Sequence, residues 1–387
     1  MLDEVDILVV GAGLAGLVTA ERMASQHGLR SLVVEKRSHI GGNCYDEIND
    51  AGVLIHKYGP HYFRTNSVRV KNYLSQFTDW LPTDYQVLSY SGAAYWQFPI
   101  NLNTYEQLTG HPASEQEFQA YLEKVRVPIK NPANSEEVII SQVGWDLYEK
   151  FFLGYTLKQW QKHPRELDPS ICARIPIRTN RDNRYLRESF QAMPASGYSA
   201  MFQRMMDVCD GKVSVLLNTH YKEVLQEIRC RHVVYTGSLD AYFDYRLGQL
   251  PYRSLRFEEE SFSNEQLQSR ETISKKPGFW QPAMQVNYPG AEDFTRIVEI
   301  KHATQQVCAN TTIVREYPQA YELGKEAFYP VMDGAGPPLS QQYRDLARQE
   351  SHVTFLGRLA EYRYYNMDQV IDVALQQTDS LAKRLAL

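Results

Sequence analysis

The sequence lacks the features that mark several common protein classes. Its 387 residues include only five cysteines, and none of them forms a Cys-x-x-Cys pair: Cys44, Cys172, Cys209, Cys230 and Cys308. An odd set without paired spacing argues against a disulfide framework or a zinc site and favours reduced thiols. No apolar run approaches the roughly 20 residues that a membrane-spanning helix needs. We therefore expect a cytoplasmic protein without a metal site or a membrane segment.

An excess of positive charge is also missing. The chain has 41 Lys and Arg residues against 46 Asp and Glu residues, which gives a net charge of −5. Such a balance produces no overall field that would attract nucleic acid, so any anion must be bound locally. Tyrosine, in contrast, is abundant at 26 residues. Its ring and hydroxyl suit a phosphorylated sugar ligand, but they suit an aromatic-rich core equally well.

The apolar pattern at the start of the chain predicts a β-α-β unit. Residues 5–10 and 31–34 are apolar and β-branched, as expected of buried strands, and residues 17–26 between them are helix-like. Residues 213–217 and 233–234 have the same strand character. We expect them to join the same sheet, which makes this domain discontinuous.

The rest of the chain predicts two further parts. Residues 115–125 and 136–152 have helical periodicity, whereas residues 295–300 and 311–316 alternate as in an antiparallel sheet. Residues 367–387 are again amphipathic and helix-like. The predicted fold class is therefore α/β, with a discontinuous Rossmann-like domain, a helical insertion and an antiparallel β-sheet domain.

The predicted domain boundaries follow these patterns. The Rossmann-like domain comprises residues 1–78, 192–245 and 345–387, and the helical insertion with a mobile substrate loop comprises residues 100–190. The antiparallel sheet domain comprises residues 79–99 and 246–344.

A dinucleotide-binding fingerprint occupies the first strand-helix turn. The glycines of Gly11-Ala12-Gly13-Leu14-Ala15-Gly16 follow a predicted strand and open a predicted helix, and Glu35 ends the next strand. The first glycine permits the tight turn, the second lets the backbone approach a pyrophosphate, and the third allows close helix packing. Glu35 can accept hydrogen bonds from ribose hydroxyls. A bound dinucleotide is expected here.

The segment after Glu35 favours FAD over NAD. Gly41-Gly42-Asn43 resembles the second glycine pair that flavoenzymes place near their cofactor. The chain carries one such fingerprint, so a second Rossmann unit for a nicotinamide cofactor is not predicted. An external reductant such as NAD(P)H is the expected electron source.

Five arginines are concentrated in fourteen residues: Arg174, Arg178, Arg181, Arg184 and Arg187. Pro176 interrupts this segment, which indicates a loop rather than a helix. Forked guanidinium donors suit phosphate oxygens, and a mobile loop could close over a diphosphate. The segment could equally be a solvated charged surface.

Six strings spread over nearly the whole chain resemble the UDP-galactopyranose mutase family. They are Ile55-His56-Lys57-Tyr58-Gly59-Pro60-His61, Gly154-Tyr155-Thr156, Lys158-Gln159-Trp160, Arg174-Ile175-Pro176-Ile177-Arg178, Leu250-Pro251-Tyr252-Arg253-Ser254-Leu255 and Gly357-Arg358-Leu359-Ala360-Glu361-Tyr362-Arg363-Tyr364-Tyr365. The resemblance implies a redox-neutral isomerase that converts a UDP-galactopyranose-type sugar to its furanose form. It also implies reduced FAD as the nucleophile, through a flavin N5-sugar adduct, and a homodimer.

The resemblance also implies roles for individual residues. Arg178 and Arg296 are expected to bind the two phosphates, with Trp160 and Arg178 on the mobile loop. His61 and Arg64 are expected beside the reacting groups. The expected substrate contacts are Gln107, Phe151, Phe152, Tyr155, Thr156, Trp160, Arg178, Tyr185, Asn287, Arg296, Tyr329 and Tyr364. The expected cofactor contacts are Gly11, Gly13, Leu14, Gly16, Glu35, Lys36, Arg37, Gly42, Asn43, Tyr58, Gly59, His61, Gly237, Arg358, Tyr364, Asn366 and Met367.

Some positions depart from the family pattern. Arg64 stands where a second histidine is usual and resembles variants that also accept UDP-N-acetylgalactosamine; Asn366 stands where Asp is usual. Pro282-Ala283 and Asn180-Arg181 differ as well. With these departures, the sequence is also compatible with a mutase that acts on another nucleotide sugar. The sequence is also compatible with a flavin oxidoreductase of the amine oxidase type and with a non-catalytic protein that binds FAD or a nucleotide sugar.

Overall fold

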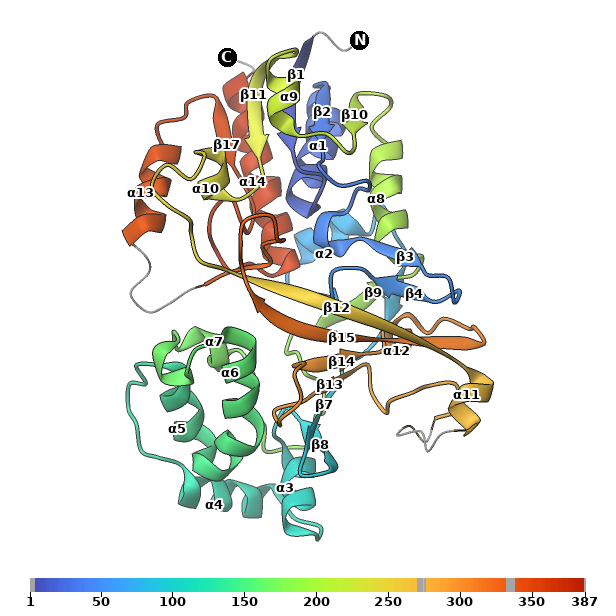
Figure 1. Ribbon diagram of the computed structural model, residues 1–387, viewed down its shortest axis with the longest axis vertical. Helices are drawn as coiled ribbons and strands as arrows, with labels where there is room; N and C mark the ends of the chain where they lie inside the picture. The colour runs from blue at the N-terminus through green and yellow to red at the C-terminus, as the bar shows by residue number, and fades with distance from the viewer. Residues whose placement is uncertain (1–3, 270–273, 275, 332–337, 386–387) are drawn as a thin grey trace.

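The computed structural model describes residues 4–269, 274, 276–331 and 338–385. They form three parts, which Figure 1 shows one above another. A parallel sheet with its helices is at the top, a long seven-stranded sheet crosses the middle, and a group of helices lies below that sheet. Both ends of the chain are in the first part, so this part is built from separate segments of the sequence.

The first part contains a parallel five-stranded sheet. Its strand order is β10 (Val213–Leu216), β2 (Ser31–Val34), β1 (Glu4–Val10), β11 (Arg229–Tyr235) and β17 (Val353–Phe355). Ile7 and Val9 pack into the core on one face of the sheet, whereas Leu8 and Val10 pack into the core on the other. Both faces are covered, which explains why these strands are apolar without alternation.

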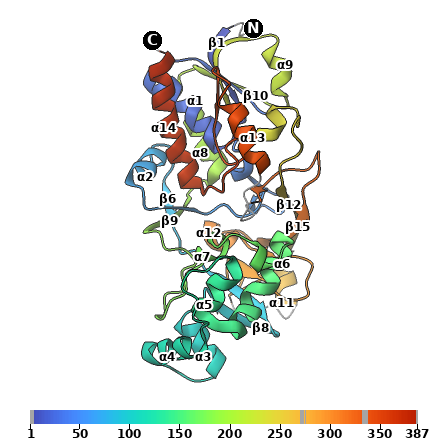
Figure 2. The ribbon, with the colours of Figure 1, turned by 90° about the vertical axis from the view of Figure 1, so that its left-hand side faces the viewer.

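Helix α1 (Leu14–His27) packs against the first of these faces, and α8 (Gly197–Asp207) and α14 (Met367–Leu385) pack against α1. Figures 1 and 2 both show α1 and α14 side by side. The strands predicted at 5–10, 31–34, 213–217 and 233–234 are confirmed. So is the terminal helix, whose last two predicted residues, 386 and 387, lie outside the described residues. The edge strand β17 was not predicted.

The second part is the seven-stranded sheet. Its order is β16 (Tyr329–Pro330), β12 (Tyr252–Ser263), β15 (Asn310–Ala320), β14 (Arg296–Val298), β13 (Gln285–Asn287), β7 (Val87–Ser91) and β8 (Ala94–Phe98). Neighbouring strands are antiparallel except β7 and β13, which run parallel. The prediction of an antiparallel sheet therefore holds with one exception. That pair joins segments about 200 residues apart, whose relative direction no local pattern encodes.

The helical part lies on one side of this sheet. It contains α3 (Leu102–Thr109), α4 (Glu115–Val125), α5 (Ser135–Tyr148), a π-helical turn (Glu149–Leu153), α6 (Gly154–Trp160) and α7 (Ser170–Ala173). The helix predicted at 136–152 is interrupted at Gly144, which has φ 76°. A Cβ at Gly144 would lie 2.4 Å from the carbonyl oxygen of Val125, so the close approach of the chain requires glycine there.

Short elements complete the three parts and the connections between them. They are β3 (Asp46–Ile48), β4 (Leu54–His56), β5 (Phe63–Thr65), α2 (Val68–Leu74), β6 (Trp80–Pro82), β9 (Phe190–Pro194), α9 (Tyr221–Leu225), α10 (Leu239–Tyr242), α11 (Asn264–Ser269), α12 (Lys301–Thr304) and α13 (Pro338–Ala347), with 3-10 turns at Gly42–Cys44 and Pro164–Glu166. Among the described residues, no helix is both long and apolar enough to cross a membrane.

Candidate active site

The glycine-rich turn between β1 and α1 forms a cradle lined by backbone. Gly11 has φ 102°, and a Cβ on Gly16 would lie 1.9 Å from the Gly11 carbonyl oxygen. A Cβ on Gly42 would lie 2.7 Å from the Cα of Gly13, so the second glycine pair closes over the first turn. No side chain caps the α1 N-terminus at Gly13. Its amides can therefore face a pyrophosphate.

Glu35 stabilises this turn from the end of β2. Its carboxylate is buried and accepts hydrogen bonds from the backbone N–H of Ala12 (2.8 Å) and of Arg37 (2.9 Å). Each oxygen can still accept from a ribose hydroxyl. The side chain of Arg37 donates to Asn43 (3.0 Å), and Arg37 and Lys36 both pair with Glu326. The two basic residues are thus held at the rim of the cradle by a carboxylate.

The other fingerprint residues lie at the same edge of the sheet. Leu14 opens α1, and Gly237 follows β11 directly after Thr236, whose Oγ1 donates to the carbonyl of Val10 at 2.7 Å. The carboxyl ends of parallel strands form the edge at which α/β folds bind nucleotides. Backbone cradle, free helix N-terminus and Glu35 together fit the adenosine diphosphate part of a dinucleotide such as FAD.

A cavity of about 340 Å³ lies where the three parts of the fold meet. The connector after β4 contributes Tyr58, Gly59 and His61 to its wall, and β5 contributes Arg64. The segment that leads into α14 contributes Arg358, Tyr364, Asn366 and, at the start of the helix, Met367. The helical part and the loop after α7 contribute Phe151, Phe152, Tyr155, Thr156, Trp160 and Tyr185, and the sheet contributes Asn287, Arg296 and Tyr329. The structure thus brings these predicted residues together around one space.

Two guanidinium groups approach the cavity from different parts of the fold. Arg174 follows α7 and donates from Nη1 to the hydroxyl of Tyr364 at 2.8 Å. Arg296 on β14 is held by Glu316 on β15, with Nη2 to Oε2 at 2.6 Å. Burial acts to lower the pKa of Arg296, but the Glu316 carboxylate and the neighbouring tyrosines together outweigh burial and raise it, so the group stays charged. Both can bind phosphate oxygens.

Tyrosine hydroxyls complete the anion-binding wall. Burial raises the pKa of Tyr155 and Tyr185, and it raises the pKa of Tyr329 to about 12. For Tyr364 burial acts in the same direction, but the charges of Arg174 and Arg358 outweigh it and lower the pKa. The first three therefore remain hydrogen-bond donors around neutral pH, and Tyr364 carries the most polarised hydroxyl.

The wall of the cavity also contains a neutral histidine and an arginine that is bonded to two other side chains. Burial lowers the pKa of His61 to about 3, and its Nδ1 lies 2.9 Å from the Gly59 carbonyl oxygen. Arg64 donates from Nε to Glu188 at 2.9 Å and from Nη2 to Asn366 at 3.1 Å. The two departures from the family pattern, Arg64 and Asn366, are therefore direct partners.

Comparison with known proteins agrees with this arrangement. Residues 150–364 match the sequence model of a family described as UDP-galactopyranose mutase, and residues 9–77 match one described as an NAD(P)-binding Rossmann-like domain. A probable UDP-galactopyranose mutase of Klebsiella pneumoniae is 35% identical, over 98% of this chain and 96% of that protein. The chain belongs to the UDP-galactopyranose mutase family.

Three further likenesses bear on its chemistry. A dTDP-fucopyranose mutase of Escherichia coli is 29% identical, over 96% of both chains. The crystal structure of a reduced UDP-galactopyranose mutase has the same fold, with a TM-score of 0.75 at 14% identity over 97% of this chain and 93% of that one. As a member of this mutase family the protein is a flavin-dependent isomerase. Putrescine oxidase shares the fold at a TM-score of 0.59 and 13% identity, so an activity of the amine oxidase type is less well supported.

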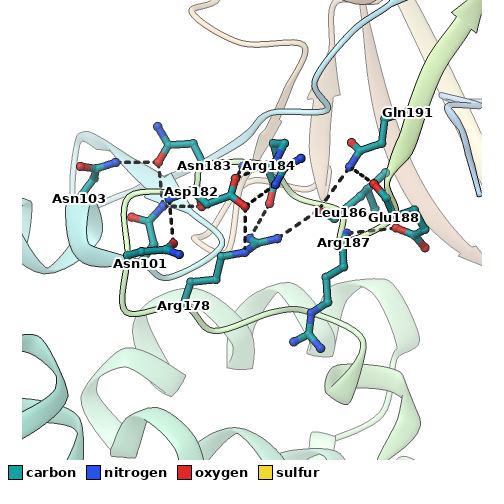
Figure 3. Close-up of polar contacts among 11 residues, drawn as sticks. Asn101, Asn103, Arg178, Asp182, Asn183, Arg184, Leu186, Arg187, Glu188 and Gln191 are labelled. Carbon is teal, nitrogen blue, oxygen red and sulfur yellow. Dashed lines mark hydrogen bonds and ion pairs between the residues drawn. The ribbon is translucent and has the colours of Figure 1, made fainter. Parts of the chain in front are cut away.

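The position of Arg178 corrects one expectation for this mutase. Arg178 does not line the cavity. Its guanidinium donates to the carbonyls of Arg184 (2.6 Å) and Leu186 (3.1 Å), and it lies 3.6 Å from Asp182. Figure 3 shows the side chain turned along its own loop. In this structure Arg178 shapes the loop, and the arginine four residues earlier faces the cavity.

Gln107 is the second correction. Its side chain is exposed on α3 and does not line the cavity. Oε1 accepts from the backbone N–H of Gln97 at 2.8 Å, and Nε2 donates to the carbonyl of Tyr95 at 3.1 Å. Gln107 thus joins α3 to β8, and the aromatic end of the cavity consists of Phe98, Phe151 and Phe152 without it.

Several cavity residues were not assigned a role from the sequence: Tyr62, Tyr85, Gln159, Arg174, Arg187, Glu188 and Gln285. For Gln285 a signal was present, because Gln285-Val286-Asn287 alternates polar and apolar residues in a strand. For Arg174 and Arg187 the signal was ambiguous, because all five loop arginines have the same chemistry.

Proposed function

We propose that the protein converts a UDP-galactopyranose-type sugar to its furanose form, using FAD in the reduced state. The observation that carries this proposal is that Arg174 and Arg296 line one cavity whose wall also includes Tyr58 and Met367. These two residues contact the cradle side, because the Arg37 guanidinium lies 4.1 Å from the Tyr58 ring centroid and Cys44, next to Gly42-Asn43, lies 3.6 Å from the Met367 sulfur. Two guanidinium groups match the charge of a diphosphate. The ring contraction is redox-neutral. In the proposed route the bond between the anomeric carbon and the diphosphate breaks and later forms again, so UDP has to remain in the cavity between these two steps.

The arginine pair stabilises that leaving group. Arg174 and Arg296 supply fixed positive charge where negative charge develops on the β-phosphate. Hydroxyl groups of Tyr155, Tyr185 and Tyr329 add neutral donors. Retention of the diphosphate matters as much as its release, because the same group must attack again after the ring has changed.

The nucleobase fits the aromatic end of the cavity. Phe98, Phe151 and Phe152 lie close together there, with ring centroids 5.6 Å apart for Phe98 and Phe152. Flat apolar faces suit a stacked pyrimidine. These three rings can recognise the shape of a base but cannot hydrogen-bond to it, so the aromatic end of the cavity does not by itself discriminate between uracil and thymine.

The opposite end fits the flavin ring. The reduced flavin, when bound there, would supply an electron-rich nitrogen as the nucleophile for the anomeric carbon. His61 is neutral and can contact the ring without adding charge. Arg358, whose Nε donates to the carbonyl of Tyr365 at 3.1 Å, offers a nearby positive charge to a reduced, electron-rich ring.

Arg64 supports a wider sugar range. Its guanidinium reaches the cavity between Glu188 and Asn366. We propose that an N–H of Arg64 accommodates the acetamide of UDP-N-acetylgalactosamine. A mutase for a thymidine-linked sugar is the second candidate, because a relative of 29% identity is named a dTDP-fucopyranose mutase.

Direct assay of isomerisation tests the function. FAD-loaded protein reduced with dithionite is incubated with UDP-galactose, UDP-N-acetylgalactosamine and dTDP-fucose. We expect a furanose product of unchanged mass, with the air-oxidised protein as the inactive control. The variant Arg296→Ala should retain the yellow cofactor and lose turnover. Failure of the reduced wild type to isomerise any of these sugars would overturn the proposal.

Two further features remain predictions from the family resemblance. We expect a homodimer, which sedimentation of the FAD-loaded protein would reveal. We also expect an external reductant such as NAD(P)H to supply the electrons, although no second Rossmann unit for a nicotinamide cofactor is predicted in this chain. Failure of both NADH and NADPH to reduce the flavin under anaerobic conditions would contradict that expectation.

A further inference from the structure

A row of polar side chains crosses three strands of the seven-stranded sheet. In the strand register Asn287 of β13 is opposite Arg296 of β14, and Arg296 is opposite Glu316 of β15. Gln285 lies two residues before Asn287 and therefore on the same face of β13. Gln285, Asn287 and Arg296 all line the cavity. Their hydrogen bonds form one chain with a fixed direction.

Arg296 sets that direction. A guanidinium can only donate, and Glu316 holds it with Nε to Oε2 at 2.9 Å. Its Nη1 lies 3.4 Å from Gln285 Oε1, so the atom of Gln285 that faces Arg296 must be the oxygen. Tyr85 donates its hydroxyl proton to the same oxygen. Burial raises the pKa of Tyr85, so this hydroxyl keeps its proton.

The orientation of Gln285 then determines that of Asn287. With its oxygen occupied by Tyr85 and Arg296, Gln285 presents Nε2 to Asn287 and donates to Oδ1 at 2.8 Å. Asn287 is 5% exposed, and no hydrogen bond to a described residue uses its Nδ2. The amide N–H groups of Asn287 are therefore the atoms left for a ligand in the cavity.

We propose that Gln285 is a positioning residue, which fixes the amide of Asn287 with its N–H groups toward the cavity so that Asn287 recognises a hydrogen-bond acceptor of the nucleotide sugar. The nature of the ligand rests on the proposed function. The oxygen and nitrogen of an amide are nearly equal in size, so sterics alone would not select this orientation. The chain from Glu316 through Arg296 and Gln285 selects it by hydrogen-bond polarity.

Gln285→Glu reverses the polarity at nearly constant volume. The new carboxylate still accepts from Tyr85 and Arg296, but it can no longer donate to Asn287. Asn287 must then turn its N–H groups toward the carboxylate and present its oxygen to the ligand acceptor. The Kd of the FAD-loaded protein for UDP-galactose, measured by isothermal titration calorimetry, should rise about tenfold, as expected for one lost and one mismatched hydrogen bond.

A double-mutant cycle separates this role from others. The new carboxylate also changes the charge next to Arg296, but that effect is equally present in an Asn287→Ala background and cancels. We expect the fold-increase in Kd caused by Gln285→Glu to be at least about threefold smaller in the Asn287→Ala background, where only the charge effect remains. An equal fold-increase in Kd in both backgrounds would overturn the inference and show that Gln285 acts through Arg296 or through the fold.

Asn287→Asp provides a second variant that leaves Gln285 intact. Its carboxylate would accept from Gln285 Nε2 and turn the second oxygen toward the ligand, so we expect a Kd at least about tenfold higher than that of the wild type. Binding as tight as that of the wild type would overturn the inference even if Gln285→Glu failed to fold. A wild type that isomerises the sugar but shows no coupling contradicts the positioning role alone, whereas a wild type that binds no nucleotide sugar contradicts the proposed function as well.

Discussion

Arg174 and Arg178 flank the same Ile-Pro-Ile turn, yet their guanidinium groups have different surroundings. Arg174 donates to Tyr364 inside the cavity, whereas Arg178 donates to two backbone carbonyls of its own loop. Loss of Arg178 would leave two loop carbonyls without their hydrogen-bond donor and would make the loop less ordered. Loss of Arg174 would remove positive charge from the cavity wall next to the ligand. The two residues therefore affect different properties.

Replacement of each arginine by alanine should reveal this difference. Arg174→Ala removes a charge-assisted hydrogen bond to phosphate, which is worth about 1.5–3 kcal/mol, so kcat/KM should fall about 10- to 100-fold. Arg178→Ala should mainly lower the thermal midpoint of unfolding, and it should raise KM less than Arg174→Ala does. Arg181, exposed and paired with Glu106, is the matched control. An equal loss of kcat/KM in both variants would mean that the loop moves Arg178 onto the ligand.

Substitution of Arg64 tests which sugars the enzyme accepts. Arg64→His removes the bridge between Glu188 and Asn366 and leaves the Glu188 carboxylate without its cation on the cavity wall. The ratio of kcat/KM values for UDP-N-acetylgalactosamine and UDP-galactose should then fall by about tenfold, the effect of about one lost hydrogen bond and a new charge. Arg64→Lys, which retains the charge, is the control. An unchanged ratio in Arg64→His would refute a role of Arg64 in sugar choice.

Among the elements that form the cavity, α6 depends on its neighbours for stability. It is seven residues long, too short to be stable alone, and it carries Tyr155, Thr156 and Trp160. Lys158 on this helix donates to the backbone carbonyls of Tyr288, Glu292 (2.9 Å) and Phe294 (3.0 Å). One side chain thus joins the helical part to the seven-stranded sheet.

Lys158→Met would leave three carbonyls without this donor while keeping the length of the side chain. We expect the free energy of unfolding in urea to fall by about 2–3 kcal/mol and KM to rise, because α6 would no longer be held against the sheet. Lys124→Met, at an exposed position on α4, is the matched control and should leave both quantities unchanged. A KM equal to that of the wild type in Lys158→Met would show that α6 holds its place through apolar packing alone.

The same elements show what the sequence could predict. Residues 5–10 were recognisable because a strand buried on both faces is apolar throughout, and the glycine fingerprint placed the cradle by local geometry alone. The choice between Arg174 and Arg178 could not be made, since their chemistry is identical and only the loop path separates them. The row of Asn287, Arg296 and Glu316 depends on strand register between segments far apart, which no short pattern specifies.

At the scale of the whole molecule, the cavity has a charge opposite to that of the chain. The net charge is −5, but Arg64, Arg174, Arg187, Arg296 and Arg358 all line one space. Glu188 and Glu316 each pair with one of these arginines. The positive charge that remains attracts a doubly charged diphosphate into a cavity with low-dielectric walls, and it is produced by contributions from all three parts of the fold.

Buried histidines make the stability of the whole fold depend on pH. Burial lowers the pKa of His56 and of His61 to about 3, whereas an unfolded chain titrates its histidines near 6.5. Below about pH 6.5 the unfolded state therefore binds more protons than the folded state, so the free energy of unfolding must fall as the pH falls. His56 Nδ1 accepts the backbone N–H of His61 at 3.0 Å, which fixes His56 as the neutral form.

Urea unfolding of the FAD-loaded protein at pH 7.5, 6.5 and 5.5 measures this effect. Each histidine should contribute a slope that approaches about 1.4 kcal/mol per pH unit below its unfolded pKa and vanishes above it. His56→Asn, which retains an acceptor for the His61 amide, should remove one histidine's share of the slope between pH 6.5 and 5.5. His111→Asn, at an exposed position, should not change it. If the slope of His56→Asn equals that of the wild type, His56 takes up its proton in the folded state without cost, and the acid sensitivity must come from other groups.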